Sequence, residues 1–248
     1  MIHPTAIIEP GAQLGANCTV HAHAIVTKHC VLGDGVVVHP FAVVGGDPQF
    51  LKFDPATPTT VRIGAGTVIR EHATLHRSIY AGKETVVGAR CFLMVGAHVG
   101  HDCELGDDVV LANGVMLGGH VSVGRNTFVG GGAGMHQFGR IGEGAMIAGG
   151  ARLTLDIAPY LLVSERNEVS GFNLVGLKRR GVGRDAIREL KDCYAQVFAP
   201  GDPRKHAAAR LTAGVVSPEA RCFLEFFAGG KRGLARPDPL ARATADDE

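Results

Sequence analysis

The sequence predicts a mainly β protein: a parallel β-helix of hexapeptide repeats, followed by a small C-terminal α-helical domain. Large aliphatic residues recur every six positions, and small residues often stand two positions before them. Glycine accounts for 35 of 248 residues, aromatic residues for only 6%, and Trp is absent. A helical period of 3.6 or a simple alternation does not produce this pattern, whereas a short strand and a turn repeated every six residues does.

The six-residue period runs in two stretches. The first comprises Ile2, Ile8, Leu14, Val20, Val26, Leu32, Val38 and Val44. The second runs from Ile63 to Leu153, and Ala81 is its one small member. Three hexapeptides make one 18-residue triangular coil, so the large side chains stack inside it. Small inward positions include four cysteines, which we expect to be core residues rather than metal ligands or disulfide partners: Cys18, Cys30, Cys91 and Cys103.

Two regions are predicted. The repeat spans residues 1–160, and a proline-rich segment at 45–62 interrupts it and should leave the prism as a loop, either functional or without a role. Helical spacing from Ala186 to Phe198, and Ser217 as an N-cap before Pro218, predict helices in a domain spanning 173–248. The tail, residues 235–248, is predicted to be disordered from its composition.

The charge and the apolar stretches of the sequence argue against nucleic acid or a membrane as a partner. The formal net charge is +1, so no global field attracts nucleic acid or an acidic membrane. The longest apolar stretches are shorter than the roughly 18 residues that a membrane span requires. The N-terminus has neither a basic segment nor an apolar one typical of export signals, and we expect a cytoplasmic enzyme.

Histidines gather at one edge of the predicted prism. Residues 18 apart lie one above another, about 4.8 Å apart. His101, Gly119 and Gln137 therefore share one column, Asp102 and His120 share the next, and His136 and His98 lie close to them. A similar column of His3, His21 and His39 has no polar neighbours, so stacking alone leaves an inert ladder and a functional site both open.

The residue types in this cluster favour acyl transfer. A neutral imidazole beside a carboxylate suits a general base that removes a proton from a sugar hydroxyl, and glycine-rich turns offer N–H groups to an oxyanion. No GxSxG motif is present, so direct attack on a thioester is the simplest scheme. No histidine pair has the five-residue spacing of the zinc-binding γ-class carbonic anhydrases, and we expect no metal. Lys178-Arg179-Arg180 is either a solvated surface or a diphosphate clamp.

Specific motifs resemble one family, the UDP-N-acetylglucosamine acyltransferases of lipid A synthesis, over nearly the whole chain to about residue 234. They are Gln49-Phe50-Leu51-Lys52, Ile69-Arg70-Glu71, Leu75-His76-Arg77, Gly96-Ala97-His98-Val99-Gly100-His101-Asp102-Cys103, Gly119-His120-Val121-Ser122-Val123, His136-Gln137-Phe138, Gly176-Leu177-Lys178-Arg179-Arg180-Gly181, Phe226-Phe227 and Arg232-Gly233-Leu234. The resemblance implies a left-handed coil and a homotrimer with clefts between neighbouring prisms. It also implies transfer of a (3-hydroxy)fatty acyl group from acyl carrier protein to the sugar 3-hydroxyl, without a cofactor.

The resemblance also implies roles for individual residues. His101 resembles the general base, Asp102 the residue that orients it, and the Gly119 backbone the oxyanion donor. Positions that resemble substrate contacts are Lys52, His98, His120, Gly131, His136 and Gln137. Positions that resemble nucleotide contacts are Asn173, Arg179 and Arg180. Gly149 matches a position where residue size limits acyl-chain length.

Two other functions remain open at the level of sequence. The first is N-acylation of a 3-amino or otherwise modified UDP-sugar, because Phe50 and Val175 stand where many members of the family carry acidic residues. The second is an inactive β-helical binding scaffold. The sequence does not determine the acyl-chain length, its hydroxylation or the catalytic rate.

Overall fold

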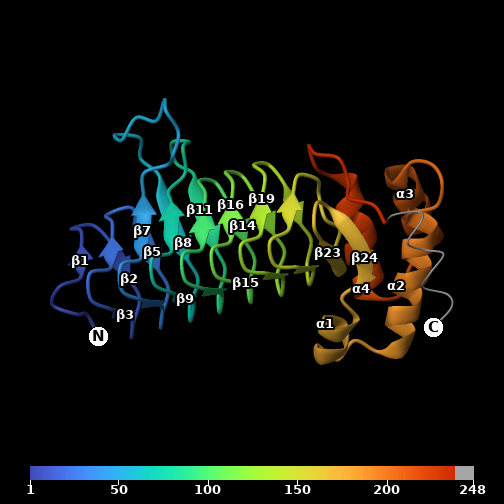
Figure 1. The fold of residues 1–248 in the computed structure, drawn as a ribbon, viewed down its shortest axis with the longest axis horizontal. Coiled ribbons are helices and arrows are strands. Elements are labelled where there is room, and N and C mark those ends of the chain that lie inside the picture. Colours follow the sequence, from blue (N-terminus) through green and yellow to red (C-terminus); the bar gives the residue numbers. More distant parts are fainter. Residues whose placement is uncertain (238–248) are drawn as a thin grey trace.

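The computed structural model describes residues 1–237. Coils stack along the long axis of a three-sided prism, and helices cover its C-terminal end (Figure 1). The predicted left-handed parallel β-helix with a C-terminal helical region is confirmed. Among residues 1–237, no helix combines the length and the apolar character needed to cross a membrane.

Within the described chain, the β-helix strands form three sheets, one for each side of the prism. Sheet 1 contains β1 (Ile7–Ile8), β4 (Ile25–Val26), β7 (Val43–Gly46), β10 (Thr74–His76), β13 (His98–Val99), β16 (Met116–Leu117), β19 (Gly134–Met135) and β22 (Arg152–Leu153). Sheet 2 contains β2 (Gln13–Leu14), β5 (Cys30–Leu32), β8 (Thr60–Ile63), β11 (Glu84–Val87), β14 (Glu104–Leu105), β17 (Ser122–Val123) and β20 (Arg140–Ile141). Sheet 3 contains β3 (Thr19–Val20), β6 (Val37–Val38), β9 (Val68–Ile69), β12 (Phe92–Leu93), β15 (Val110–Leu111), β18 (Phe128–Val129), β21 (Met146–Ile147), β23 (Leu161–Ser164) and β24 (Glu168–Phe172).

The hexapeptide register explains the interior. In the regular part each strand pairs in parallel with the strand 18 residues later, as Met116 pairs with Gly134. The second residue of each pair points inward, so Leu93, Leu111 and Leu117 are fully buried. The four cysteines at small inward positions are buried and free, as predicted: Cys18, Cys30, Cys91 and Cys103.

The proline-rich interruption projects from the prism as a loop between β7 and β8 (Figure 1). Its predicted ends, 45–46 and 60–62, belong to those two strands, which leaves residues 47–59 as the loop. Arg77, only 1% exposed, anchors this loop through its guanidinium. It donates to the Asp47 carboxylate at 2.8 Å and to the carbonyls of Pro55 and Thr57 at 2.7 and 2.6 Å, and it lies 4.7 Å from the Phe53 ring centre.

A second excursion was not predicted. The sequence register runs through Ala81, but Ala81 is exposed and Glu84 pairs with Thr60, 24 residues earlier. Residues 77–83 therefore leave the coil as a longer corner between β10 and β11. The prediction of an unbroken register was wrong here because the insertion equals one hexapeptide, so the aliphatic pattern resumes in phase.

The C-terminal region differs from the prediction in its boundaries. The antiparallel pair β23–β24 extends the sheet to Phe172, beyond the predicted end at residue 160. Four helices and a 3₁₀ turn follow within the described chain: α1 (Leu174–Arg179), α2 (Arg184–Val197), α3 (Pro203–Ala213), α4 (Pro218–Glu225) and η1 (Phe226–Ala228). The Ser217 side chain caps α4 by accepting from Ala220 N, as expected, whereas the alanine-rich α3 lacks an apolar period and was missed.

Part of the predicted disordered tail is ordered. Ala235 is 1% exposed and its N–H donates to Asp156 O at 2.9 Å, while Pro237 forms a bridge with Val169. These backbone contacts fix residues 235–237 against the end of the prism. Residues 238–248 of the predicted tail lie outside the described residues.

We expect Arg77→Met to lower the free energy of unfolding by about 2–4 kcal/mol, because the loop carbonyls lose a buried donor. Loop 47–59 should also become more sensitive to protease. Arg62→Met is the matched control: Arg62 pairs with Glu84 at a half-exposed site, where such a pair contributes less than about 1 kcal/mol. Denaturant titration and limited proteolysis would measure both effects, and equal costs for the two variants would contradict the anchoring role.

Candidate active site

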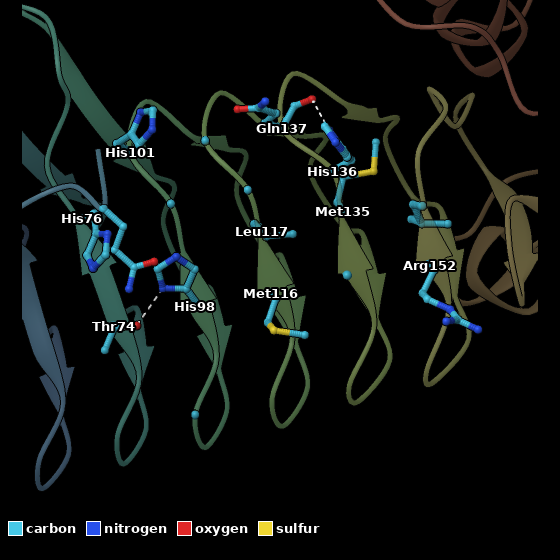
Figure 2. Close-up of a pocket in the computed structure, with 17 residues that line it drawn as sticks. Thr74, His76, His98, His101, Met116, Leu117, Met135, His136, Gln137 and Arg152 are labelled. Atoms are coloured by element: carbon cyan, nitrogen blue, oxygen red, sulfur yellow. Dashed lines mark hydrogen bonds between the residues drawn. The ribbon is translucent and has the colours of Figure 1, made fainter. Parts of the chain in front are cut away.

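An open groove of about 840 Å³ runs along the outer face of sheet 1 (Figure 2). Its floor consists of outward residues on successive strands, from His98 through Met116 and Gly134 to Arg152. Its wall is the corner that leads to sheet 2, with His101, Gly119, His136 and Gln137. The groove therefore joins several of the predicted site residues on one face of a single chain.

His101 and Asp102 form the expected pair at this corner. His101 Nδ1 lies 2.8 Å from Asp102 Oδ2, and both side chains are largely shielded from solvent. An ionised carboxylate only accepts hydrogen bonds, so Nδ1 carries the proton and Nε2 is left as the base. Burial acts to raise the pKa of Asp102, but hydrogen bonds from His101, Ser78 and the Ile79 N–H outweigh it and hold that pKa below its usual value.

Gly119 lies directly beneath the His101 ring. A Cβ at residue 119 would stand 2.6 Å from His101 Nε2, closer than real Cβ atoms approach, so only glycine leaves room for the imidazole. Within residues 1–237 no acceptor binds the Gly119 N–H. A free backbone donor beside the base is what an oxyanion requires.

The N-terminal end of the groove holds two further imidazoles. His98 Nδ1 lies 2.8 Å from Thr74 Oγ1, and the His76 ring packs edge-on against His98 (Figure 2). Burial and the nearby His98 and His101 lower the pKa of His76 to about 4, and burial followed by His101 lowers that of His98. Both rings are consequently neutral at neutral pH and provide hydrogen bonds rather than charge.

Of the other predicted residues at this corner, His120 packs against His101, whereas His136 and Gln137 line the groove. His120 stacks on Phe138 and packs edge-on against His101, and it lines a neighbouring hollow with Asp102 rather than the groove itself. Burial is the main cause that lowers its pKa. His136 and Gln137 line the groove and are held by Arg232 from the C-terminal segment, which donates to His136 Nδ1 and to Gln137 O.

Six further predicted residues lie away from both the groove and the His101 corner of this chain. Lys52 is exposed on loop 47–59, while Gly131 and Gly149 share a column at the corner between sheets 3 and 1. Asn173 caps α1 by accepting from Gly176 N at 2.9 Å, and it donates to Gly144 O at 3.1 Å. Arg179 ends α1, and the Arg180 guanidinium carbon lies 5.3 Å from the Tyr160 ring centre. One chain alone does not bring these residues to His101.

Three residues with side chains that could bind a metal ion lie close together at the corner. Nitrogen and oxygen atoms of His101, Asp102 and His120 lie within 4.8 Å of one another. Both Asp102 oxygens, however, already accept hydrogen bonds, from Ser78, Ile79 and His101. This arrangement favours an oriented base over a metal centre, and the absence of a metal stays a prediction.

The structure also adds residues that the sequence did not single out. Gln49, Thr74 and His76 line the groove, while Ser78 and Arg232 hold its wall. Gln49, His76 and Arg232 belong to motifs noted in the sequence, but nothing in the spacing placed them at the site. Ser78 lies in the 77–83 excursion, which the unbroken six-residue period of the sequence did not indicate.

Comparisons with known proteins show which family this chain resembles. A family model described as UDP-N-acetylglucosamine O-acyltransferase, domain 2, matches residues 156–235, and models of transferase hexapeptide repeats match residues 84–119 and 120–154. Relatives from Rhizobium johnstonii and Agrobacterium fabrum are each 36% identical to this chain. The matches cover 95% and 96% of this chain and 94% and 96% of those relatives, both named acyl-[acyl-carrier-protein]–UDP-N-acetylglucosamine O-acyltransferase.

Solved structures are similar over the same extent. The UDP-N-acetylglucosamine acyltransferase from Campylobacter jejuni has 33% identity and a TM-score of 0.82, with 96% of this chain and 100% of that chain covered. The Francisella novicida enzyme of the same name has 28% identity and a TM-score of 0.88, with 98% and 96% covered. This chain is thus similar to these proteins in both sequence and fold, along the prism and the helical region. It belongs to the acyl-[acyl-carrier-protein]–UDP-N-acetylglucosamine O-acyltransferase family.

Proposed function

We propose that this protein transfers a (3-hydroxy)fatty acyl group from acyl carrier protein to the 3-hydroxyl of UDP-N-acetylglucosamine, a step of lipid A biosynthesis. The observation that carries the proposal is the His101–Asp102 pair above Gly119, at the wall of a long groove. Family membership adds the donor and the acceptor, which the relatives' names state. We further propose that the reaction takes place in the cytoplasm.

The proposed reaction follows from these positions. His101 Nε2 takes the proton of the sugar 3-hydroxyl as its oxygen attacks the thioester carbonyl, and Asp102 stabilises the imidazolium that forms. The Gly119 N–H donates to the resulting oxyanion. Collapse of the tetrahedral intermediate releases the carrier thiolate, which takes the proton from His101. Neither a metal nor another cofactor is required, because the thioester is already activated.

Contacts to the sugar and the nucleotide are proposed from the family resemblance. His98, His120, His136 and Gln137 surround the corner where the sugar would lie, and Lys52 would approach from its loop. Asn173, Arg179 and Arg180 would hold the UDP group. The position of Arg180 supports this proposal. Its two terminal guanidinium nitrogens are buried and have no hydrogen-bond acceptor among residues 1–237, and a diphosphate anion would supply one.

We propose a homotrimer whose clefts complete the site. The outer face of sheet 3 is a continuous apolar row in register, comprising Val37, Val68, Phe92, Val110, Phe128 and Met146. Sheet 2 instead presents polar residues such as Glu104, Ser122 and Arg140 along the same coils. A second chain against the apolar faces would explain why the proposed nucleotide contacts lie away from the groove of one chain.

His101→Ala should lower kcat by about 10²–10⁴, the usual contribution of a general base, with little change in the KM for the UDP-sugar. Steady-state assays with an acyl carrier protein thioester would measure this. His21→Ala is the matched control, because His21 stacks on His39 at a different corner of the prism. The expectation that this ladder has no polar neighbours was wrong, since the Glu71 carboxylate lies 3.4 Å from His39 Nδ1, but the carboxylate pairs with His39 rather than with His21. Turnover by His101→Ala near the wild-type rate would contradict the assignment.

Sedimentation of the wild type should give the mass of three chains at micromolar concentration. Phe128→Glu should weaken the assembly, because it places a charge in the apolar row of sheet 3. Ser122→Glu, one strand earlier on the polar face of sheet 2, should remain trimeric. A wild-type monomer, or equal behaviour of the two variants, would refute the proposed interface.

We expect the wild type to prefer acyl chains of roughly 12–14 carbons or more, because each buried methylene contributes about 0.8 kcal/mol. An added Cβ at Gly149 would contact only backbone atoms of Gly131, so a Met side chain would project outward into the proposed cleft. Gly149→Met should therefore shift the preference towards shorter donors in a chain-length series. Gly183→Met, at the start of α2, serves as the control, and an unchanged preference in Gly149→Met would exclude Gly149 as the length determinant.

A further inference from the structure

The Asp102 carboxylate is held by a segment of the preceding coil. Ser78 lies in the 77–83 excursion and is fully buried. Its hydroxyl donates to Asp102 Oδ1, and the Ile79 N–H donates to Asp102 Oδ2 at 3.2 Å. Oδ2 is also the atom that accepts from His101 Nδ1 at 2.8 Å. One short segment therefore contacts both oxygens of the residue that orients the proposed base.

The hydrogen bonds around Ser78 run in one direction. The Tyr80 N–H donates to Ser78 Oγ at 3.0 Å, so the hydroxyl is polarised as it donates onward. The Tyr80 carbonyl, 3.4 Å away, is the alternative acceptor for the Ser78 proton. The carboxylate is both closer and charged, and charge-assisted hydrogen bonds are the stronger ones.

The same arrangement is not repeated along the column. Residues equivalent to Asp102 on the next two coils are His120 and Phe138, and all three have positive φ at the tight corner. Neither offers a carboxylate to the residue before it, which is Gly119 or Gln137. The six additional residues between β10 and β11 thus lie at the same corner as the His101–Asp102 pair, one coil earlier.

We propose that Ser78, assisted by the Ile79 N–H, is a positioning residue that fixes the Asp102 carboxylate and, through it, the tautomer and orientation of His101. This inference rests on the proposed function, because it assigns His101 the role of base. Without Ser78 the carboxylate would be free to rotate away from Nδ1. The imidazole would then sample the tautomer whose Nε2 is protonated and cannot accept the sugar proton.

A double-mutant cycle tests this coupling. Ser78→Ala should lower kcat roughly 10- to 100-fold, the range expected for a lost hydrogen bond to a charged group, and leave the KM for the UDP-sugar nearly unchanged. In an Asp102→Ala background the same substitution should change kcat by less than about threefold, because its target is gone. Losses that simply multiply would overturn the proposal.

Thr67→Val is the matched control. Thr67 is fully buried and its hydroxyl donates to Gly88 O at 2.8 Å, at a different corner of the prism. Its removal deletes a buried hydroxyl without reaching Asp102, and turnover should stay near the wild-type rate. An equal loss in Thr67→Val and Ser78→Ala would reduce Ser78 to a general structural role.

A substrate-free measurement separates this inference from the proposed function. In NMR spectra of the protein labelled with ¹⁵N-histidine, the His101 Nδ1–H signal is identified by its absence in His101→Ala. It should shift or broaden in Ser78→Ala and persist in Thr67→Val. An unchanged signal in Ser78→Ala would overturn the positioning role, whereas a wild type that does not acylate UDP-N-acetylglucosamine would overturn the proposed function instead.

Discussion

Backbone hydrogen bonding between successive coils is the constraint on which the rest of this structure depends. Pairs such as Leu117 with Met135 repeat at 18-residue intervals and fix every side chain in a column. Interior columns are filled by aliphatic residues, cysteine and threonine, so the coil needs no large aromatic core. Exterior columns become functional surfaces without further adjustment, because neighbouring residues of a column are held one strand spacing apart.

The proposed active site uses this regularity and two departures from it. The regular column places Gly119 beneath the His101 ring, where no other residue would fit. The 77–83 excursion supplies donors to Asp102, and the 47–59 loop, anchored by Arg77, brings Gln49 to the groove. A rigid coil thus supplies the base and the free N–H, and the two inserted segments supply groups that a six-residue repeat has no room to carry.

The sequence predicted most of the fold, because a strict period determines both the interior and the columns. It also predicted that His101, Asp102, Gly119, His136 and Gln137 share one edge. It did not reveal Ser78, since an insertion of one full hexapeptide leaves the register intact. Nor did it reveal the contact of Arg232 with His136, which joins residues 96 positions apart and depends on how the C-terminal segment folds back.

The choice of substrate distinguishes the proposed O-acylation from N-acylation of a 3-amino sugar. The arrangement of His101 Nε2, Asp102 and the Gly119 N–H suits removal of a proton from a hydroxyl, whereas a 3-amino group is already nucleophilic when neutral. The most direct measurement is a competition between UDP-N-acetylglucosamine and its 3-amino analogue for one acyl carrier protein thioester, with products identified by mass spectrometry. We expect an ester at the sugar 3-oxygen as the main product, and formation of the amide alone, or of neither product, would contradict the role of His101 as the base for a sugar hydroxyl.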